Sequence, residues 1–406
     1  MDKKLKILQI TPRFPFPADD GGKIGIANIY KQFYKQNCDV TLFSLNNEII
    51  PKKAIEEAKQ YGEVYIIKQN TNNTLFKIFK SFILNQSLYI NKHINNNIIK
   101  HLFNLIKNSN FDIIHCDHTC MAPLALKIKD NFGIPFGLRL HNIEHLIWKR
   151  YYDRLAFYHP GKLFIKQQYR LLQKWESYYI KKADINFAIT EKDYNEALIL
   201  SGYKANIIIA SAGVDVDEWE PDNSTKRNKY ELILATTFKW KHNVDGITWF
   251  IKNVLSVLKE KIPEITLTLI GKSPPNFLFR YKHLGVNCIG YVDKVQPYYN
   301  RANLNISPLF VGSGIRIKIL EAMSMELPVI ATPIAAEGIN ANESDGLIIA
   351  LNKDEFITKI IEMISNTKLR YELGKSARNF VKNFYTWDST VSKMIDSYHD
   401  ILSKNQ

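Results

Sequence analysis

The sequence predicts an α/β protein with two doubly wound parallel sheets, one in each half of the chain. Short apolar runs rich in β-branched residues alternate with segments whose apolar residues recur at helical spacing, which is typical of parallel strands joined by helices. This alternation stops at a polar stretch, 218–229, and then starts again. At 406 residues the chain is long enough to bury two such cores.

The predicted elements follow one another in a regular order. In the first half we expect a helix at 23–33 and strands at 5–10, 38–45, 63–67, 113–116, 135–140 and 184–189. In the second half we expect strands at 230–235, 265–270, 287–289, 304–307 and 328–331. The sequence therefore predicts domains at 1–217 and 230–387, a linker at 218–229, and a terminal amphipathic helix at 388–406.

The net charge and the cysteine content indicate which kinds of partner and which cellular compartment to expect. Lys+Arg 54 against Asp+Glu 40 gives a net charge of +14, which indicates an anionic partner. No zinc-finger, RNA-motif or helix-turn-helix pattern is present, so we predict no nucleic-acid partner. Four scattered cysteines indicate a reduced, cytoplasmic protein. Cys116 and Cys120 with His115 and His118 lack a second ligand pair, so no metal site is predicted.

No segment of the sequence has the properties of a membrane-spanning helix. No window reaches the roughly 18 apolar residues that a spanning helix needs. The short apolar run near the N-terminus ends at Pro12 and indicates a first strand, not a targeting segment. We therefore expect a protein that is not integral to a membrane.

A glycine turn between a strand and a helix gives the strongest local signal. Gly312, Ser313 and Gly314 separate the strand at 304–307 from a predicted helix at 315–325. The N–H groups and dipole of a helix N-terminus suit a phosphate. Lys318 and Glu321 share one face of that helix. A cation near phosphates and a carboxylate near ribose hydroxyls would form a nucleotide diphosphate site, although an ordinary strand–turn–helix unit remains the alternative.

The run GSGIRIKILEAMSMELPVIAT, residues 312–332, resembles the donor-site segment of the family 4 retaining glycosyltransferases. Glu321 matches the second glutamate of that family's signature, and Ser313 stands where many members have the first. The resemblance implies the GT-B architecture, in which two Rossmann-like domains face each other across a cleft. It also implies transfer of a sugar from a nucleotide diphosphate sugar to a hydroxyl, with retained anomeric configuration and no metal or other cofactor.

Other segments extend this resemblance along the chain. Gly21 and Gly22 match the family's glycine-rich first loop near the donor phosphates, although a simple turn and helix cap is equally compatible with the residues. The run 139–144 matches an R-x-H-N-x-E motif, which implies that His141 contacts the donor sugar or the reacting hydroxyl and that Glu144 belongs to the donor site. Strand ends in open α/β sheets face the ligand, whereas a histidine that caps the next helix is the alternative.

The resemblance also implies how the second domain holds the nucleotide. The backbone of Gly290, Tyr291 and Val292 would receive the base, and the turn Gly312–Ser313–Gly314–Ile315 would receive the phosphates. The family's usual arginine–lysine pair is missing from the first loop of this domain. We expect Arg316 and Lys318 to supply the positive charge, with Lys241 as another donor-site cation. The helix at 388–406 would return to pack on the first domain.

Two basic, aromatic segments of the first domain account for part of the charge. Residues 75–84 and 148–182 interleave lysine and arginine with phenylalanine and tyrosine. Such helices lie on anionic bilayers, and a solvated helix face remains the other interpretation. The enzymes that the chain resembles bind lipid-linked acceptors in this domain. We therefore expect a cytoplasmic protein, with attachment to the inner face of the plasma membrane as a further hypothesis.

The function that these observations favour is a step of bacterial-type surface glycan synthesis, such as capsule, lipopolysaccharide or exopolysaccharide. The expected partners are a nucleotide sugar donor and a glycan or lipid-linked acceptor. A sugar-nucleotide 2-epimerase is one alternative, and it should carry paired acid/base carboxylates. A non-catalytic GT-B partner subunit is the other, although His141, Glu144 and Glu321 argue against it.

Overall fold

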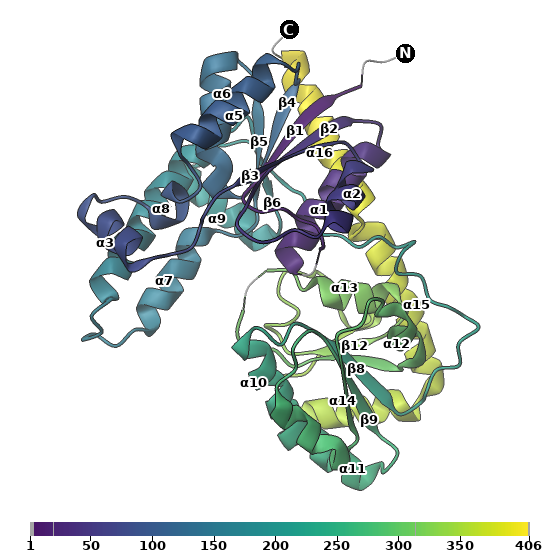
Figure 1. Ribbon diagram of the computed structural model, residues 1–406. Coiled ribbons are helices and arrows are strands. Elements are labelled where there is room, and N and C mark those ends of the chain that lie inside the picture. The colour runs from purple at the N-terminus through teal and green to yellow at the C-terminus, as the bar shows by residue number, and fades with distance from the viewer. Residues whose placement is uncertain (1–3, 19, 313, 405–406) are drawn as a thin grey trace. The chain divides into compact units, whose positions relative to one another are not determined.

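The computed structural model describes residues 4–18, 20–312 and 314–404 and consists of two compact units. The first unit comprises Met1–Ser211 with Thr390–Gln406, and the second comprises Ala212–Ser389. Each unit is an α/β domain around its own parallel sheet (Figure 1). Ser313, a predicted donor-site residue, and the last two residues of the predicted terminal helix lie outside the described residues.

In the described part of the first unit, seven parallel strands lie in the order β3-β2-β1-β4-β5-β6-β7. The strands are β1 Lys6–Thr11, β2 Asp39–Asn46, β3 Glu63–Lys68, β4 Ile113–Asp117, β5 Phe136–Leu140, β6 Ile185–Ala188 and β7 Ile207–Ile209. The direction in which strands are added reverses between β1 and β4, where ligands of open α/β sheets bind.

Helices from along the first part of the chain cover this sheet, and the C-terminal helix joins them (Figure 1). They are α1 Gly21–Lys35, α2 Lys52–Lys59, α3 Leu75–Ile83, α4 Leu88–Asn91, α5 Asn96–Lys107, η1 Thr119–Met121, α6 Ala122–Phe132, α7 Glu144–Arg154, α8 Lys162–Lys182, α9 Glu191–Ser201 and α16 Trp387–Lys404. Tyr398 of α16 is fully buried against the rings of Phe33 and Phe187, so the C-terminal helix packs on the first sheet.

The described part of the second unit has a six-stranded parallel sheet in the order β10-β9-β8-β11-β12-β13. Its strands are β8 Glu231–Ala235, β9 Thr266–Ile270, β10 Val286–Gly290, β11 Leu304–Ser307, β12 Val329–Ala331 and β13 Leu347–Ile349. Its helices are α10 Lys241–Phe250, η2 Ile251–Leu255, α11 Ser256–Lys261, η3 Asn276–Leu284, α12 Gln296–Arg301, α13 Ile317–Ser324, η4 Glu343–Asp345, α14 Lys353–Ser365 and α15 Thr367–Phe384. The predicted fold class, two doubly wound parallel sheets, is confirmed.

Local chemistry explains where the elements depart from their predicted bounds. The helix predicted at 23–33 begins earlier, at Gly21, because the side chain of Asp20 accepts a hydrogen bond from the N–H of Lys23 and caps it. The helix predicted at 315–325 begins later, because Arg316 keeps an extended backbone and precedes the first turn. The edge strands β7 and β13 were not predicted; with three residues each they are too short to show periodicity.

Residues 218–229, predicted as a linker, pack against the second unit. The guanidinium of Arg227 donates hydrogen bonds to the backbone carbonyls of Met325 and Glu326, each at 2.7 Å. The carbonyl of Trp219 accepts hydrogen bonds from Ser324 and Arg378. The polar composition of this stretch therefore reflects a surface segment of the domain and not a free connection.

Candidate functional site: two strand edges

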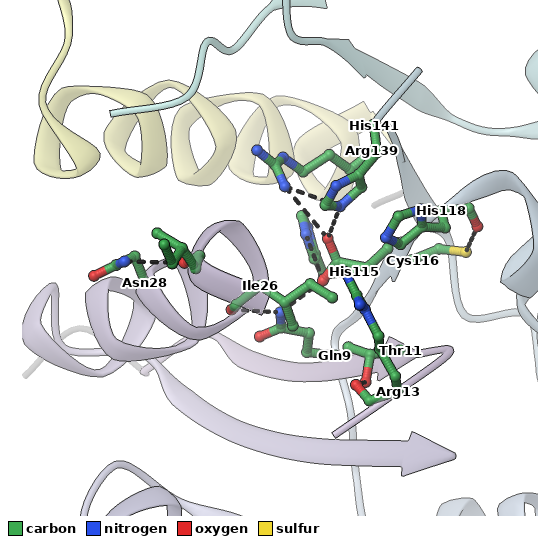
Figure 2. A network of polar contacts seen from close by, with 12 residues as sticks. Gln9, Thr11, Arg13, Ile26, Asn28, His115, Cys116, His118, Arg139 and His141 are labelled. Carbon is green, nitrogen blue, oxygen red and sulfur yellow. Dashed lines mark hydrogen bonds and ion pairs between the residues drawn. The ribbon is translucent and has the colours of Figure 1, made fainter. Parts of the chain in front are cut away.

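Buried polar side chains interrupt the apolar pattern of the central strands of the first sheet toward their carboxyl ends. Gln9 of β1 lies opposite His115 of β4, and Asp117 at the end of β4 lies opposite Arg139 of β5. All four side chains are fully or almost fully buried. Buried polar groups are costly unless they are paired, so this group must be held together by its own contacts (Figure 2).

The carboxylate of Asp117 is the centre of this group. It accepts hydrogen bonds from Nε2 of Gln9 at 2.7 Å and from Nε2 of His141 at 2.9 Å. The guanidinium of Arg139 lies 3.7 Å away. Burial alone would raise the pKa of Asp117, but its contacts with His115 and His141 hold this pKa well below its usual value. Asp117 is therefore an anion that fixes the residues around it.

His141 follows β5 and is neutral at physiological pH. Burial, and then the charge of Arg139, lower the pKa of His141 to about 4. Nε2 of His141 lies 2.9 Å from the carboxylate of Asp117 and 2.9 Å from Nη1 of Arg139. This nitrogen can donate a hydrogen bond to Asp117 or accept one from Arg139. We assign the proton to Nε2, because a carboxylate is the stronger partner. Nδ1 then carries the lone pair and can accept a proton.

His118 extends the group beyond the residues that were predicted for the site. Its ring stacks on that of His141, with centroids 3.6 Å apart and an interplanar angle of 8°. Its backbone has φ 69°, which is rare for a residue other than glycine and is found at functional sites. Its Nε2 is buried, with no hydrogen-bond partner among the described residues. His118 therefore places a buried, unsatisfied nitrogen, which is unusual in a folded protein, beside the ring of His141.

The C-terminal helix supports this group from behind. The hydroxyl of Tyr398 lies 2.6 Å from Nδ1 of His115, whose Nε2 is 3.6 Å from Asp117. Burial raises the pKa of Tyr398 well above its usual value, so the phenol stays neutral. A Cβ at Gly137 would lie 2.7 Å from the ring of Tyr398, so glycine is required there. Tyr398 is thus a positioning residue that acts through His115.

Gly21 and Gly22, predicted as a loop, form the first turn of α1. Arg13 pairs with the capping carboxylate of Asp20 at 2.7 Å, and its guanidinium fills the space that a Cβ at Gly22 would need. One turn later a Cβ at Gly25 would lie 3.2 Å from Nη1 of Arg139 and 3.8 Å from His141. The second turn of α1 is therefore adjacent to His141, whereas Gly21 and Gly22 lie one turn earlier, in the helix and not in a loop.

Glu144 begins α7, three residues after His141, and has an unusual proton affinity. Burial, and then repulsion from Glu176, raise the pKa of Glu144 to about 7. Glu176 of α8 is itself buried and accepts hydrogen bonds from the N–H groups of Glu144 and His145, at 2.8 and 2.9 Å. A carboxyl group whose pKa is raised to about 7 therefore lies on the same strand-to-helix segment as His141.

This raised pKa predicts that Glu144→Gln stabilises the folded protein by an amount that depends on pH. The folded-state pKa is higher than the unfolded value of 4.5, so the favourable contribution of Glu144 is complete below 4.5 and is lost as pH rises through 7. We expect Glu144→Gln to raise the free energy of unfolding by about 1–3 kcal/mol at pH 8 and by almost nothing at pH 4.5, measured by urea denaturation. The control Glu56→Gln, at an exposed position of α2, should give no gain at either pH. An equal rise in the free energy of unfolding at both pH values would show that the raised pKa of Glu144 is not its cause.

In the second unit, the loops that follow β8, β10 and β11 lie at one edge of the parallel sheet. They carry Lys241 at the start of α10, the backbone turn Gly290–Val292, and Gly312 with residues 314–318. Arg316 lies close enough to His242 to contribute, after burial, to lowering the pKa of that histidine. These predicted donor-site segments therefore follow the carboxyl ends of their strands, which is the edge where α/β proteins bind nucleotides.

The turn before α13 depends on its glycines. Gly312 has φ 153° and Gly314 has φ 79°, both in the region that favours glycine. The guanidinium of Arg316 occupies the space that a Cβ at Gly312 would need. Burial lowers the pKa of Arg316, and the nearby Glu337 opposes this shift. Arg316 is therefore held against the turn, immediately before the N–H groups of α13.

Lys318 and Glu321 are brought together as their spacing predicts, and they pair with each other. Nζ of Lys318 is 2.7 Å from Oε2 of Glu321 and lies 5.4 Å from the ring centroid of Trp219. Glu321 is buried, and burial raises its pKa while Lys318 opposes the shift. The predicted roles of Lys318 at the diphosphate and of Glu321 at the ribose stay predictions; in this structure each group neutralises the other.

Across residues 4–18, 20–312 and 314–404, no three His, Cys, Asp or Glu side chains are grouped so that they could hold a metal ion. No helix in the same part of the chain combines the length and apolar character needed to cross a membrane.

Known proteins resemble the chain in sequence and in fold. Residues 230–366 match the model of a protein family described as glycosyl transferases group 1. An uncharacterized 44.6 kDa protein in the cps region of Klebsiella pneumoniae is 23% identical over 414 residues, covering 94% of this chain and 96% of the relative. The UDP-Gal:alpha-D-GlcNAc-diphosphoundecaprenol alpha-1,3-galactosyltransferase of Escherichia coli is 21% identical over 320 residues, covering 74% of this chain and 78% of that enzyme. The crystal structure of Anabaena HepE in complex with UDP has a TM-score of 0.68 at 12% identity, covering 98% of this chain and 100% of HepE.

Proposed function

We propose that this chain, a glycosyltransferase with the GT-B fold, moves a sugar from a nucleotide diphosphate sugar to an acceptor hydroxyl with retention of configuration and without a metal ion. The observation that carries the proposal is the edge of the second sheet, where a glycine turn, Arg316 and the Lys318–Glu321 pair meet at the start of α13. A helix N-terminus with adjacent cations stabilises a diphosphate, which is the leaving group of such a reaction.

On the donor side, each group has a chemical task. The N–H groups of α13 and the guanidinium of Arg316 would bind the diphosphate and stabilise the charge that develops as the sugar leaves. Lys318 would turn from Glu321 to the phosphates, and the released carboxylate of Glu321 would accept hydrogen bonds from the ribose hydroxyls. The backbone of Gly290–Val292 would receive the base. That HepE was crystallised with UDP supports a uridine nucleotide.

In the first unit, the neutral imidazole of His141 would contact the donor sugar or the attacking hydroxyl. Asp117 holds the proton of His141 on Nε2, so Nδ1 is the atom that could receive the proton of the hydroxyl. His118 would donate or accept a further hydrogen bond through Nε2. No carboxylate of the described residues is assigned as a nucleophile, so we propose no covalent intermediate.

The relatives support a place in surface glycan synthesis. One is described by its position in a cps region, and another by transfer of galactose to a diphosphoundecaprenol-linked sugar. We therefore propose a lipid-linked glycan as the acceptor.

The stereochemistry of the reaction tests this proposal. The enzyme is incubated with UDP-glucose, UDP-galactose or UDP-N-acetylglucosamine, and the anomeric protons of the first-formed sugar product, by transfer or by slow hydrolysis, are followed by NMR. We expect an α-configured product from one of these α-donors, at a rate that EDTA changes less than about twofold. A β-configured first product, or a rate that EDTA lowers tenfold or more, would contradict the proposal. Conversion of the donor to its C2 epimer would show a sugar-nucleotide epimerase instead.

A further inference from the structure

Helix α3 of the first unit turns its apolar residues toward solvent. A surface helix of a globular domain normally buries its apolar stripe. In α3, however, Ser81 is the buried residue, while Leu75 is 85% exposed, Phe76 73%, Phe79 63% and Ile83 61%. Single exposed apolar side chains are common, but contiguous ones mark an interaction site.

A second exposed apolar group lies where α7 turns into α8. Phe157 is 87% exposed and Tyr158 is 77% exposed, and their rings contact each other. The first half of α8 packs against α3. The ring centroids of Phe82 and Phe164 are 6.2 Å apart, and Gln167 donates a hydrogen bond to the carbonyl of Phe82. Figure 1 shows α3 beside α8. We call the residues Leu75, Phe76, Phe79, Ile83, Phe157 and Tyr158 the apolar ridge.

The charges around the apolar ridge have one sign. Residues 64–111, which include α3, contain six lysines and no aspartate or glutamate. Residues 148–182, which include most of α7 and all of α8, contain nine lysines and arginines against two acidic residues, one of which is the buried Glu176. Two copies of the chain that met through this surface would bring like charges together, whereas an anionic surface would complement them.

We propose that the apolar ridge docks the protein on an anionic lipid bilayer. At nine residues α3 is too short to span a membrane, but a short helix with apolar side chains on its exposed face and lysines beside them can lie in the interface. The apolar side chains enter the boundary between headgroups and acyl chains, and Lys80 with the basic residues of α7 and α8 attracts the anionic headgroups. For a lipid-linked acceptor, a point that rests on the proposed function, this docking brings the first unit to its substrate.

Co-sedimentation of the full chain with vesicles tests the docking. Vesicles of phosphatidylcholine with about 30% phosphatidylglycerol should bind the protein at least tenfold more strongly than pure phosphatidylcholine vesicles, and about 0.5 M NaCl should weaken the binding, because salt screens surface charge. Binding to neither kind of vesicle, or equal binding to both, would overturn the proposal. A protein that dimerises through the apolar ridge in sedimentation velocity, and ignores vesicles, would also overturn it.

Two matched pairs of variants locate the surface. Phe76→Ser with Phe79→Ser should weaken partition tenfold or more, whereas Ile199→Ser with Tyr203→Ser, at two exposed apolar positions of α9 and its C-terminal end, should leave it within twofold. Lys77→Glu with Lys80→Glu should also weaken it tenfold, whereas Lys52→Glu with Lys53→Glu, an equal charge change on α2, should not. α3 variants that bind like wild type would overturn the assignment.

Nucleotide binding separates this docking from the reaction. All four double variants should keep the wild-type affinity for UDP, and urea denaturation should show that they are folded. A wild-type protein that binds anionic vesicles but no nucleotide would overturn the proposed function and leave the docking intact. The reverse result would overturn the docking alone.

Discussion

Replacing Asp117 with alanine should lower the free energy of unfolding by about 3–5 kcal/mol and abolish sugar transfer. The carboxylate is fully buried and is the counter-charge of Arg139, which is also buried. Its loss would leave the guanidinium without an anion and would remove the hydrogen bond that fixes the tautomer of His141. Urea denaturation measures the first effect, and the rate of transfer from the donor measures the second.

A double variant distinguishes charge from shape in this group. The double variant Asp117→Ala with Arg139→Met removes both buried charges, so neither is left without its partner. Compared with Asp117→Ala alone, much of the lost free energy of unfolding should return, while sugar transfer should stay absent. The control Asp130→Ala, at an exposed position of α6, should change the free energy of unfolding by less than about 0.5 kcal/mol. If Asp117→Ala alone costs less than about 1 kcal/mol, Asp117 is not the centre of the group.

Replacing Glu321 with glutamine should weaken nucleotide binding by about 10–100-fold, or roughly 1.4–2.7 kcal/mol, without lowering the stability of the free protein. Glutamine keeps the shape of the side chain but replaces one carboxylate oxygen with an NH₂ group, which cannot accept a hydrogen bond from ribose. The free protein should tolerate the change, because burial already opposes the charge of Glu321.

The control for this variant is Glu372→Gln, at an exposed position of α15, which should bind nucleotide like wild type. Calorimetric titration with the nucleotide gives the affinities, and urea denaturation gives the stabilities. A Glu321→Gln protein whose nucleotide affinity lies within twofold of wild type would remove this residue from the donor site.

The sequence predicted the strands that carry strong apolar runs but not those held in place by their neighbours. Residues 304–307 were predicted to the residue, because a compact apolar run ends at Pro308. The three-residue strands β7 and β13 carry no such signal, since pairing with β6 and β12 makes them strands. The linker prediction at 218–229 failed for a similar reason: contacts from Arg227 to residues nearly a hundred positions away cannot be read from polar composition.

The predicted site was incomplete where residues distant in sequence meet. The positions of His141 and Glu144 at a strand end could be predicted from the motif around them. Asp117, by contrast, was not singled out, and His118 drew attention only as part of a possible metal cluster. Both residues follow the strand predicted at 113–116, just as His141 follows the next strand. This shared position at a strand end was the signal that could have identified them. The contact between His115 and Tyr398 spans 283 positions and had no local signal.

Binding of nucleotides to the wild-type protein tests the central claim most directly. Thermal unfolding is measured with UDP, GDP, ADP and CMP, because a ligand that binds only the folded state raises the melting temperature according to its affinity. We expect one nucleotide, most plainly UDP, to raise the melting temperature, and Glu321→Gln to reduce that rise at the same concentration. If none of the four shifts the melting temperature, the edge of the second sheet does not bind a nucleotide and the account of the donor site is wrong.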